Sequence, residues 1–299
     1  MKTIAILGPT ASGKTALAIE LARTHGAHIL SLDSLSIYKE IDIASAKPSL
    51  EERGGIVHFG MDVLLPSEHF DVTMFFECYR EAKEACKRDK KDLIIVGGTG
   101  FYLKAMMEGF SLKPQIPLHV KEEIEAKLHH LEASYALIET HDPAYATKIA
   151  RNDSYRIEKW LEIFLSAHEI PSDYLAKTKQ PPLIQELELF EIETPKEVLA
   201  QKITLRTQMM LKMGLIDEVF SLEKRYTRTP QCMRAIGIKE VLDYFDGKYT
   251  LTQLEERISL NTLHLAKRQR TFNASQFEAH PKGNVDALKP LIEASLHVK

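Results

Sequence analysis

The sequence predicts an α/β fold in which a parallel sheet is covered by helices, with a helical insertion domain and a helical C-terminal region. Three observations lead to this prediction. Short apolar runs alternate with helical patterns over residues 1–110, which is typical of consecutive βαβ units. The segment 114–182 has helical patterns throughout and prolines at both ends. One further alternating run follows, and the rest of the 299-residue chain again has helical patterns.

The first part of the chain contains most strands of the predicted sheet. Each strand is a short apolar run, and the first run stops at Gly8-Pro9. The first helix is expected to end at Gly26, because glycine commonly follows the last helical turn. A short helix is expected after Gly97–Gly100. The expected strands are Thr3–Leu7, His28–Leu32 and Leu93–Val96, and the expected helices are Gly13–His25 and Phe75–Asp89.

The segment 114–182 is predicted to be a helical domain inserted into a core that residues 1–113 and 183–299 form together. The pairs Asp142-Pro143 and Asn152-Asp153 have the residue types that cap helix starts. The helix that follows the second pair places apolar residues on one face, at spacings of three and four residues.

After the insertion, the alternating residues Leu187–Glu193 predict a strand that returns to the sheet. A helix start follows, with Thr194 as the expected cap and Pro195 in the first turn. That helix is expected to end near Gly214. A later break is expected at Asp246-Gly247, with a new helix start at Thr250 or Thr252.

Composition excludes several classes of protein. Hydrophobic residues make up 44% of the chain and charged residues 27%, which excludes disorder, collagen or a coiled coil as a whole-chain description. No stretch approaches the ~20 continuous apolar residues of a membrane helix, and the N-terminal run is too short for a signal peptide. The three cysteines form no C-x-x-C pair, so we expect reduced, packed thiols in a cytoplasmic protein.

A phosphate-binding loop is the strongest local signal. It fits the pattern G-x-x-x-x-G-K-[ST] and lies between an expected strand and an expected helix, as the mechanism requires. Glycines let the backbone wrap around a phosphate, and N–H groups at the helix start add partial positive charge. Lys14 can reach a terminal phosphate, and the Thr15 hydroxyl can hold Mg²⁺. The loop consists of Gly8, Pro9, Thr10, Ala11, Ser12, Gly13, Lys14 and Thr15.

Two further polar residues follow strands of the predicted sheet. Asp33 comes just beyond the second strand, and Thr99 follows the strand Leu93–Val96, which ends without an acidic residue. Because the carboxyl ends of parallel strands line the ligand crevice, both residues should face the bound phosphate. An ATPase or GTPase of this kind also needs a strand-end carboxylate for its metal-bound water network, and the later strand Leu93–Val96 supplies none, so transfer to a non-water acceptor fits better.

An ordered set of motifs extends over residues 4 to about 272. The set comprises Gly8–Thr15, Asp33-Ser34 with Tyr38, Asp42-Ile43, Ala46-Lys47-Pro48, Gly97–Tyr102, Asn152-Asp153 with Arg156, Ile203 with Arg206 and Met210, Arg234–Gly237, and Ala266–Gln269. A phosphate loop alone is shared by many functions. The whole set, in this order, resembles the bacterial tRNA dimethylallyltransferase (tRNA isopentenyltransferase) family.

The resemblance implies a phosphate-loop kinase-like core and a specific reaction. A dimethylallyl group would pass from dimethylallyl diphosphate to N6 of the adenine immediately 3′ of the tRNA anticodon, with Mg²⁺ as cofactor. Asp33 would be the general base, Thr99 would lie at the oxygen that bridges prenyl group and diphosphate, and Arg206 would bind the diphosphate. The stretch Thr10–Thr15 would hold the diphosphate where a kinase holds nucleotide phosphates, with Thr15 on the metal.

The resemblance also implies that the anticodon stem-loop binds to the insertion and to parts of the core, and we expect the enzyme to be a monomer. Residues 202–239 include eight basic and three acidic residues, an excess of positive charge in a chain whose net charge is −3. We interpret Met209, Met210 and Met213 as core residues. The implied tRNA contacts are Asp33, Ser34, Leu35, Ser36, Thr99, Lys121, Tyr155, Arg156, Ile157, Glu158, Lys159, Arg234, Ala235, Ile236, Gly237, Ile238 and Lys239.

Three other functions remain open at this point. An adenylate isopentenyltransferase would prenylate a free nucleotide, but a small acceptor requires neither the helical insertion nor the basic C-terminal region. A small-molecule kinase would hold ATP in the loop, but no lid with paired arginines is recognisable. An RNA-binding protein with a relic loop would have no need of the intact Lys14, Thr15, Asp33 and Thr99.

Overall fold

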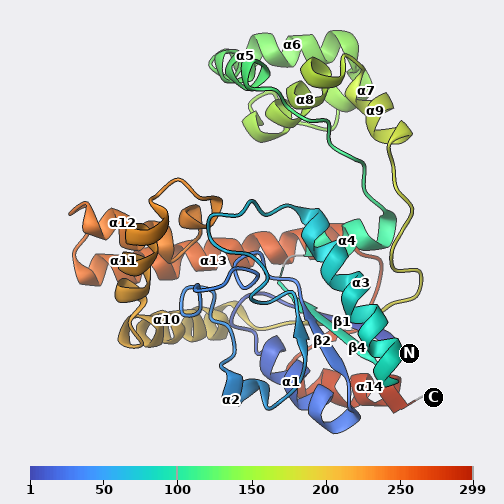
Figure 1. Ribbon diagram of the computed structural model, residues 1–299, viewed down its shortest axis with the longest axis vertical. Coiled ribbons are helices and arrows are strands. Elements are labelled where there is room, and N and C mark those ends of the chain that lie inside the picture. The colour runs from blue at the N-terminus through green and yellow to red at the C-terminus, as the bar shows by residue number, and fades with distance from the viewer. Residues whose placement is uncertain (99, 298–299) are drawn as a thin grey trace. The chain divides into compact units, whose positions relative to one another are not determined.

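The computed structural model describes residues 1–98 and 100–297. The chain forms two compact units, one made of Met1–Lys104 with Ile184–Lys299 and the other of Ala105–Leu183 (Figure 1). The segment 114–182, predicted to be a helical insertion, lies within the second unit. Each unit has a hydrophobic core of its own.

A six-stranded parallel sheet forms the centre of the first unit, in the order β3-β2-β4-β1-β5-β6. The structure confirms all four strands expected from the sequence. It adds β3 and β6, which have two residues each and are too short to show a periodic pattern. The strands are β1 Thr3–Leu7, β2 His28–Ser31, β3 His58–Phe59, β4 Leu93–Gly97, β5 Glu188–Ile192 and β6 Lys282–Gly283.

The register of the central strands brings their carboxyl ends to one edge. Leu7 of β1 lies beside Gly97 of β4, and Leu32 donates its N–H to the carbonyl of Val96 at 2.8 Å. Strands β1 and β4 are buried along their whole length, which explains why they appear in the sequence as continuous apolar runs. The phosphate loop and Asp33 therefore both follow strands that end at this edge.

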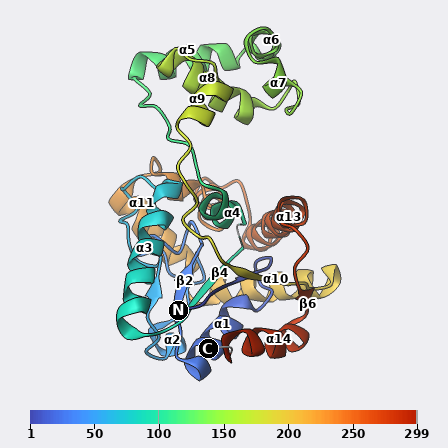
Figure 2. The ribbon, with the colours of Figure 1, turned by 90° about the vertical axis from the view of Figure 1, so that its right-hand side faces the viewer.

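Helices cover the sheet (Figure 2). Helices α1 (Lys14–His25) and α14 (Val285–His297) share one hydrophobic cluster with side chains of β1, β4 and β5, including Ile4, Val96 and Phe190. Helix α3 (Val72–Asp89) packs against β2 and β3. The remaining elements of this unit are α2 Leu50–Arg53, α10 Lys196–Lys212, α11 Leu215–Tyr226, the 3₁₀ helix Gln231–Arg234, α12 Ile238–Phe245 and α13 Leu251–Gln276; α4 Gly100–Glu108 leads from the first unit into the second.

Two predicted helix starts can be compared with the structure. Thr250 caps α13, because its hydroxyl accepts from the Gln253 N–H and the Gln253 side chain accepts from the Thr250 N–H. The prediction that Thr194 caps α10 is wrong, since Pro195 occupies the cap position and no side chain bonds there. Pro195 has extended backbone angles, so the helix begins one residue later than a threonine cap would require.

The second unit consists of the helices expected in the insertion, around the buried indole of Trp160. Asp142 organises this core from a buried position. It caps α7 through the Tyr145 N–H at 3.3 Å, accepts from Trp160 Nε1 at 3.1 Å and from the Ser172 hydroxyl at 2.9 Å. Asp153 caps α8 as predicted. The helices are α5 Leu118–Leu128, α6 Leu131–His141, α7 Pro143–Ala146, α8 Ser154–Ala167 and α9 Pro171–Lys177.

Two expectations about the whole chain can also be compared with the structure. Within the part of the chain that the structure describes, no helix is both long and apolar enough to cross a membrane. Cys78, Cys86 and Cys232 are buried and unpaired as thiols, which confirms their interpretation as packed, reduced residues. Burial raises the pKa of each of these thiols to about 11.

Candidate active site

The phosphate loop connects β1 to α1, as the motif predicts. Ala11 and Gly13 have left-handed backbone angles, with φ of 64° and 93°, and the Ser12 N–H turns back to the carbonyl of Pro9 at 3.2 Å. Successive residues of this kind point backbone N–H groups into one concavity. Helix α1 begins at Lys14, where the first-turn N–H groups have no partner within the helix. The loop therefore has the form of an anion cradle.

Two cationic side chains lie beside the cradle. Lys14 Nζ donates to the carbonyl of Pro9 at 3.1 Å, and Arg206 Nη1 of α10 donates to the Thr10 hydroxyl at 3.3 Å. Burial lowers the pKa of Lys14 to about 8, the positive charge of Arg206 lowers it further, and Asp33 acts in the opposite direction. Burial also lowers the pKa of Arg206, again opposed by Asp33. A bound anion would stabilise both cations, so the arrangement favours a negatively charged ligand.

Asp33 is held in a defined orientation directly after β2. Its Oδ1 accepts from the N–H groups of Leu35 at 2.9 Å and Ser36 at 3.1 Å, so the side chain closes a turn. Both bonds use the same oxygen, and among the described residues the structure records no partner for Oδ2. The carboxylate thus has a structural role and still presents one oxygen at the edge where the phosphate loop lies.

The other predicted reaction residue, Thr99, lies outside the described residues. The strand before it is described, and β4 is hydrogen-bonded to β2 on one side and to β1 on the other. The end of this strand therefore lies between the strand that precedes Asp33 and the strand that precedes the phosphate loop.

A cleft of about 740 Å³ opens beside the loop. Lys14, Thr15 and Arg206 contribute to its lining, and α10 adds an apolar wall. The interpretation of all three methionines as core residues is wrong for two of them, because Met209 is 53% exposed and Met213 65% exposed in this wall. Helix α10 buries the face that contains Leu199, Ile203, Thr207 and Met210, whereas Met209 lies outside that face and Met213 is the residue that follows the helix.

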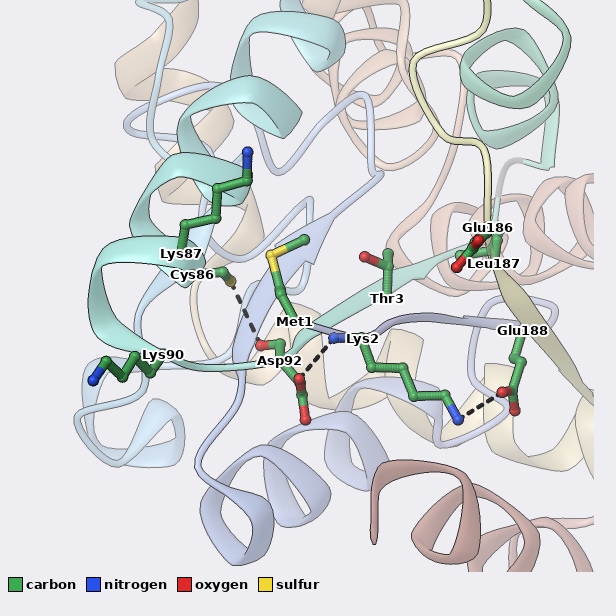
Figure 3. A pocket seen from close by; sticks show the side chains of 10 residues that line it. All are labelled: Met1, Lys2, Thr3, Cys86, Lys87, Lys90, Asp92, Glu186, Leu187 and Glu188. Atoms are coloured by element: carbon green, nitrogen blue, oxygen red, sulfur yellow. Dashed lines mark hydrogen bonds and ion pairs between the residues drawn. The ribbon is translucent and has the colours of Figure 1, made fainter. Parts of the chain in front are cut away.

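A second cavity, of about 930 Å³, lies at the opposite, amino-terminal edge of the sheet (Figure 3). Lys2 pairs with two of the acidic residues that line it. The Lys2 ammonium lies 2.6 Å from Glu188, and the Lys2 N–H donates to Asp92 at 2.8 Å. Hydrogen bonds from Lys2 and Ser295 lower the pKa of Glu188. Ligands of parallel α/β sheets bind at the carboxyl ends of the strands, so this cavity does not compete with the phosphate loop as a candidate site.

The residues expected to contact tRNA differ in exposure. In the first unit, Ser34, Arg234 and Lys239 are exposed, Leu35, Ala235 and Ile236 are half-buried, and Ser36 and Gly237 are buried. In the second unit, Lys121, Tyr155 and Arg156 are exposed, and Glu158 and Lys159 are half-buried. Lys159 forms ion pairs with Glu158 and Glu162, and Arg156 pairs with Asp153.

Ile157 and Ile238 do not fit the expectation of direct contact through their side chains. Both are 0% exposed. Ile157 belongs to the core cluster around Trp160, and Ile238 is the first residue of α12, on its buried face. Both isoleucines are next to exposed basic residues, Arg156 and Lys239. The predicted contacts were contiguous stretches of sequence, and any such stretch on a helix includes positions that face the core.

Sequence reasoning missed the roles of two residues that hold the site together. Glu218 of α11 accepts from the N–H groups of Asp42, Ile43 and Ala44 at 2.7–2.9 Å, and nothing in the sequence indicated this. The Lys47 side chain, 2% exposed, donates to the Tyr38 carbonyl and to the carboxylates of Asp42 and Asp62. The Ala46-Lys47-Pro48 motif included this lysine but did not indicate which groups it would bind. Both residues fix the loop that follows Asp33.

The parallel sheet, the glycine-lysine loop at the end of its central strand and the two cations beside it define a protein with the phosphate-loop fold. The family model for IPP transferase matches residues 36–276, and the chain belongs to this family.

Similar proteins agree with this assignment along nearly the whole chain. The tRNA dimethylallyltransferase of Sulfurovum sp. is 51% identical over 98% of this chain and 97% of its own length, and that of Aliarcobacter butzleri is 50% identical over 96% and 97%. The crystal structure of the tRNA isopentenylpyrophosphate transferase from Bacillus halodurans has a TM-score of 0.70 and 29% identity, covering 99% of this chain and 96% of that one. A eukaryotic dimethylallyltransferase, captured acting on tRNA, has a TM-score of 0.78 and 27% identity, covering 91% and 70%.

Proposed function

We propose that this protein transfers a dimethylallyl group from dimethylallyl diphosphate to N6 of the adenine immediately 3′ of the anticodon in tRNA, releasing diphosphate. One observation supports this most directly. The buried cations Lys14 and Arg206 flank an anion cradle, and the carboxylate of Asp33 lies near enough to influence the pKa of both. A leaving-group site and a base thus occur together, as group transfer to an amine requires.

The donor is held by its diphosphate. Within the stretch Thr10–Thr15, the N–H groups at the start of α1 and the charges of Lys14 and Arg206 face the oxygens on which negative charge develops as the allylic carbon–oxygen bond breaks. Because these N–H groups and cations are already oriented before the reaction, they stabilise the developing charge without having to move. We assign Thr99 to the oxygen that bridges the prenyl carbon and the diphosphate, from the family resemblance.

Mg²⁺ fits the residues of the cradle as a companion of the diphosphate. Among the described residues, no three His, Cys, Asp or Glu side chains are grouped so that they could hold a metal ion. The half-buried Thr15 hydroxyl lines the cleft at the start of α1. Mg²⁺ characteristically combines one or two protein oxygens with phosphate oxygens and water, so Thr15 would hold it together with the ligand. When bound, the ion neutralises charge on the diphosphate.

Asp33 acts on the acceptor. An exocyclic adenine amine is a weak nucleophile, and a carboxylate that removes its proton as the new bond forms makes it stronger. The N6–carbon bond forms, the carbon–oxygen bond of the donor breaks, the proton passes to Asp33, and diphosphate leaves. The turn bonds to Oδ1 hold the carboxylate in place, which leaves Oδ2 for the amine.

The acceptor is the anticodon stem-loop of tRNA, and we assign its contacts to the exposed members of the predicted set. In the second unit these include Lys121, Tyr155 and Arg156, and in the first Arg234 and Lys239. An adenine in a loop can leave its stack at a cost of a few kcal/mol, which favours a loop over a duplex as substrate. A tRNA acceptor places the proposed activity in the cytoplasm, and we expect the enzyme to act as a monomer.

A transfer assay tests the proposal. The protein is incubated with labelled dimethylallyl diphosphate, Mg²⁺ and unmodified tRNA, and nucleosides of the digested tRNA are analysed. Label on N6 of the adenosine next to the anticodon is expected, together with one diphosphate for each group transferred. Parallel reactions contain AMP as acceptor or ATP in place of the donor. Efficient labelling of AMP alone, or release of ADP without any prenyl transfer, would refute the proposed function.

A further inference from the structure

Gln269 connects helix α13 to the phosphate loop. Its Oε1 accepts from the backbone N–H of Thr10 at 3.0 Å, a contact between residues 259 positions apart in the chain. The Thr10 side chain in turn accepts from Arg206. One loop residue is therefore fixed from two helices, through its backbone by α13 and through its side chain by α10.

The same glutamine side chain also touches the end of β4. A Cβ atom placed on Gly98 would lie 2.4 Å from Gln269 Nε2 and 3.0 Å from its Cδ. Real Cβ atoms essentially never approach another atom as closely as 2.4 Å, so the Gln269 amide would have to shift if residue 98 carried a side chain. The Gly98 backbone is not in the left-handed region, and the obstacle to a methyl group there is the Gln269 side chain.

Helix α13 is anchored one turn further on, which keeps Gln269 in register. Asn273 is completely buried and donates from Nδ2 to Glu191 of β5 at 3.0 Å. Glu191 is also paired with Lys282 at 2.8 Å and with His280 at 3.1 Å. Residues four positions apart lie on the same helix face, so this anchor holds the face that carries Gln269 against the sheet.

We propose that Gln269 is a positioning residue of the donor site, which sets the distance between the phosphate loop and the end of β4. This inference rests on the proposed function, in which the loop holds the diphosphate. The loop contains Ala11 at a φ of 64°, a conformation that non-glycine residues rarely adopt. The bond from Thr10 to Gln269 stabilises that conformation before the ligand arrives. Without it, part of the binding free energy of the diphosphate is used to order the loop.

The size of the effect follows from the kind of bond. A neutral hydrogen bond contributes modestly to stability, which corresponds to a change of roughly 2- to 10-fold in affinity. Gln269→Leu removes the acceptor and keeps most of the volume, so it should weaken diphosphate binding by about this factor. The KM for dimethylallyl diphosphate should rise in proportion, and the KM for tRNA should stay within about twofold.

Gly98→Ala supplies an independent perturbation that leaves Gln269 intact. The added methyl group displaces the amide from its position, so this variant should weaken diphosphate binding to a similar extent. In the Gln269→Leu background the contact has already been lost, and Gly98→Ala should add little. Gln276→Leu is the matched control, because Gln276 is exposed near the end of the same helix and, among the described residues, its side chain bonds only to the neighbouring Ser275.

The test measures binding of inorganic diphosphate with Mg²⁺ by calorimetry for wild type, both single variants, the double variant and the control. Weaker binding by each single variant, no further loss in the double variant and an unchanged control would support the proposal. Wild-type affinity in Gln269→Leu, or losses that simply add in the double variant, would overturn it. Prenyl transfer by the wild-type protein is assayed separately, so failure of the proposed function is distinguishable from failure of this inference.

Discussion

The depressed pKa of Lys14 makes donor affinity depend on pH. Burial, reinforced by Arg206, lowers this pKa from its ordinary value of 10.5 to about 8. At about 1.4 kcal/mol for each factor of ten, the ligand-free site destabilises the charged ammonium by roughly 3 kcal/mol. A bound diphosphate favours the charged form and offsets this penalty. Affinity for dimethylallyl diphosphate should therefore fall as pH rises above 8, by up to about tenfold for each pH unit.

Lys14 also makes folding stability depend on pH, and this dependence has the opposite sign to that of donor affinity. Between pH 8 and 10.5 the unfolded chain holds a proton on Lys14 that the folded, ligand-free protein has lost. Stability contributed by this group therefore rises with pH through that window, while donor affinity declines. A loss of donor affinity in this range thus cannot be attributed to unfolding caused by Lys14.

Titration calorimetry with dimethylallyl diphosphate and Mg²⁺, without tRNA, measures both affinity and proton uptake. At pH 8, in buffers of different ionisation enthalpy, binding should take up roughly half a proton. Lys14→Arg is the control, because a guanidinium stays charged across this range and any titration of the ligand is common to both proteins. A pH dependence that is the same in Lys14→Arg, or binding without proton uptake in the wild type, would refute the reasoning.

Three further predictions concern other parts of the molecule. Asp33→Asn keeps an oxygen for the two turn bonds, so it should bind diphosphate normally and lower kcat by roughly 10²–10⁴, whereas unchanged turnover in single-turnover assays would remove Asp33 from the reaction. Asp142→Ala leaves the buried Trp160 N–H without its acceptor and should lower the free energy of unfolding by about 1–3 kcal/mol in urea titrations; a loss below 0.5 kcal/mol would contradict that role. The three buried cysteines, with pKa raised to about 11, should react with iodoacetamide at pH 8 only after denaturation, and rapid labelling of the native protein would count against their burial.

Local patterns predicted the elements that contain their own signals. Strands such as Thr3–Leu7 are continuous apolar runs, and the cap at Asp153 and the phosphate loop each depend on residues close together in sequence. The start at Thr194 failed because the residue types of a cap were present without the geometry, which Pro195 determined. Strands of two residues, such as β6, have no period to detect.

The parts of the site that could not be predicted depend on distant contacts. The bond between Thr10 and Gln269 joins opposite ends of the chain, and no spacing rule indicates it. Glu218 looks like an ordinary acid in the first turn of a helix until folding brings the backbone of residues 42–44 against it. The two exposed methionines of α10 show the same limit, because side-chain hydrophobicity alone does not tell which helix face the tertiary structure covers.

The pairing of β6 with β5, and the burial of α14 against α1, have a consequence for biosynthesis. Leu288, Ile292 and Leu296 complete the cluster beneath the first strand and the helix that follows the phosphate loop. A nascent polypeptide emerging from a ribosome therefore cannot close this cluster until residue 296 has left the exit tunnel. The strand Thr3–Leu7 must wait for a segment that is translated much later, and ligand binding at the loop should be acquired only after that segment has packed against it.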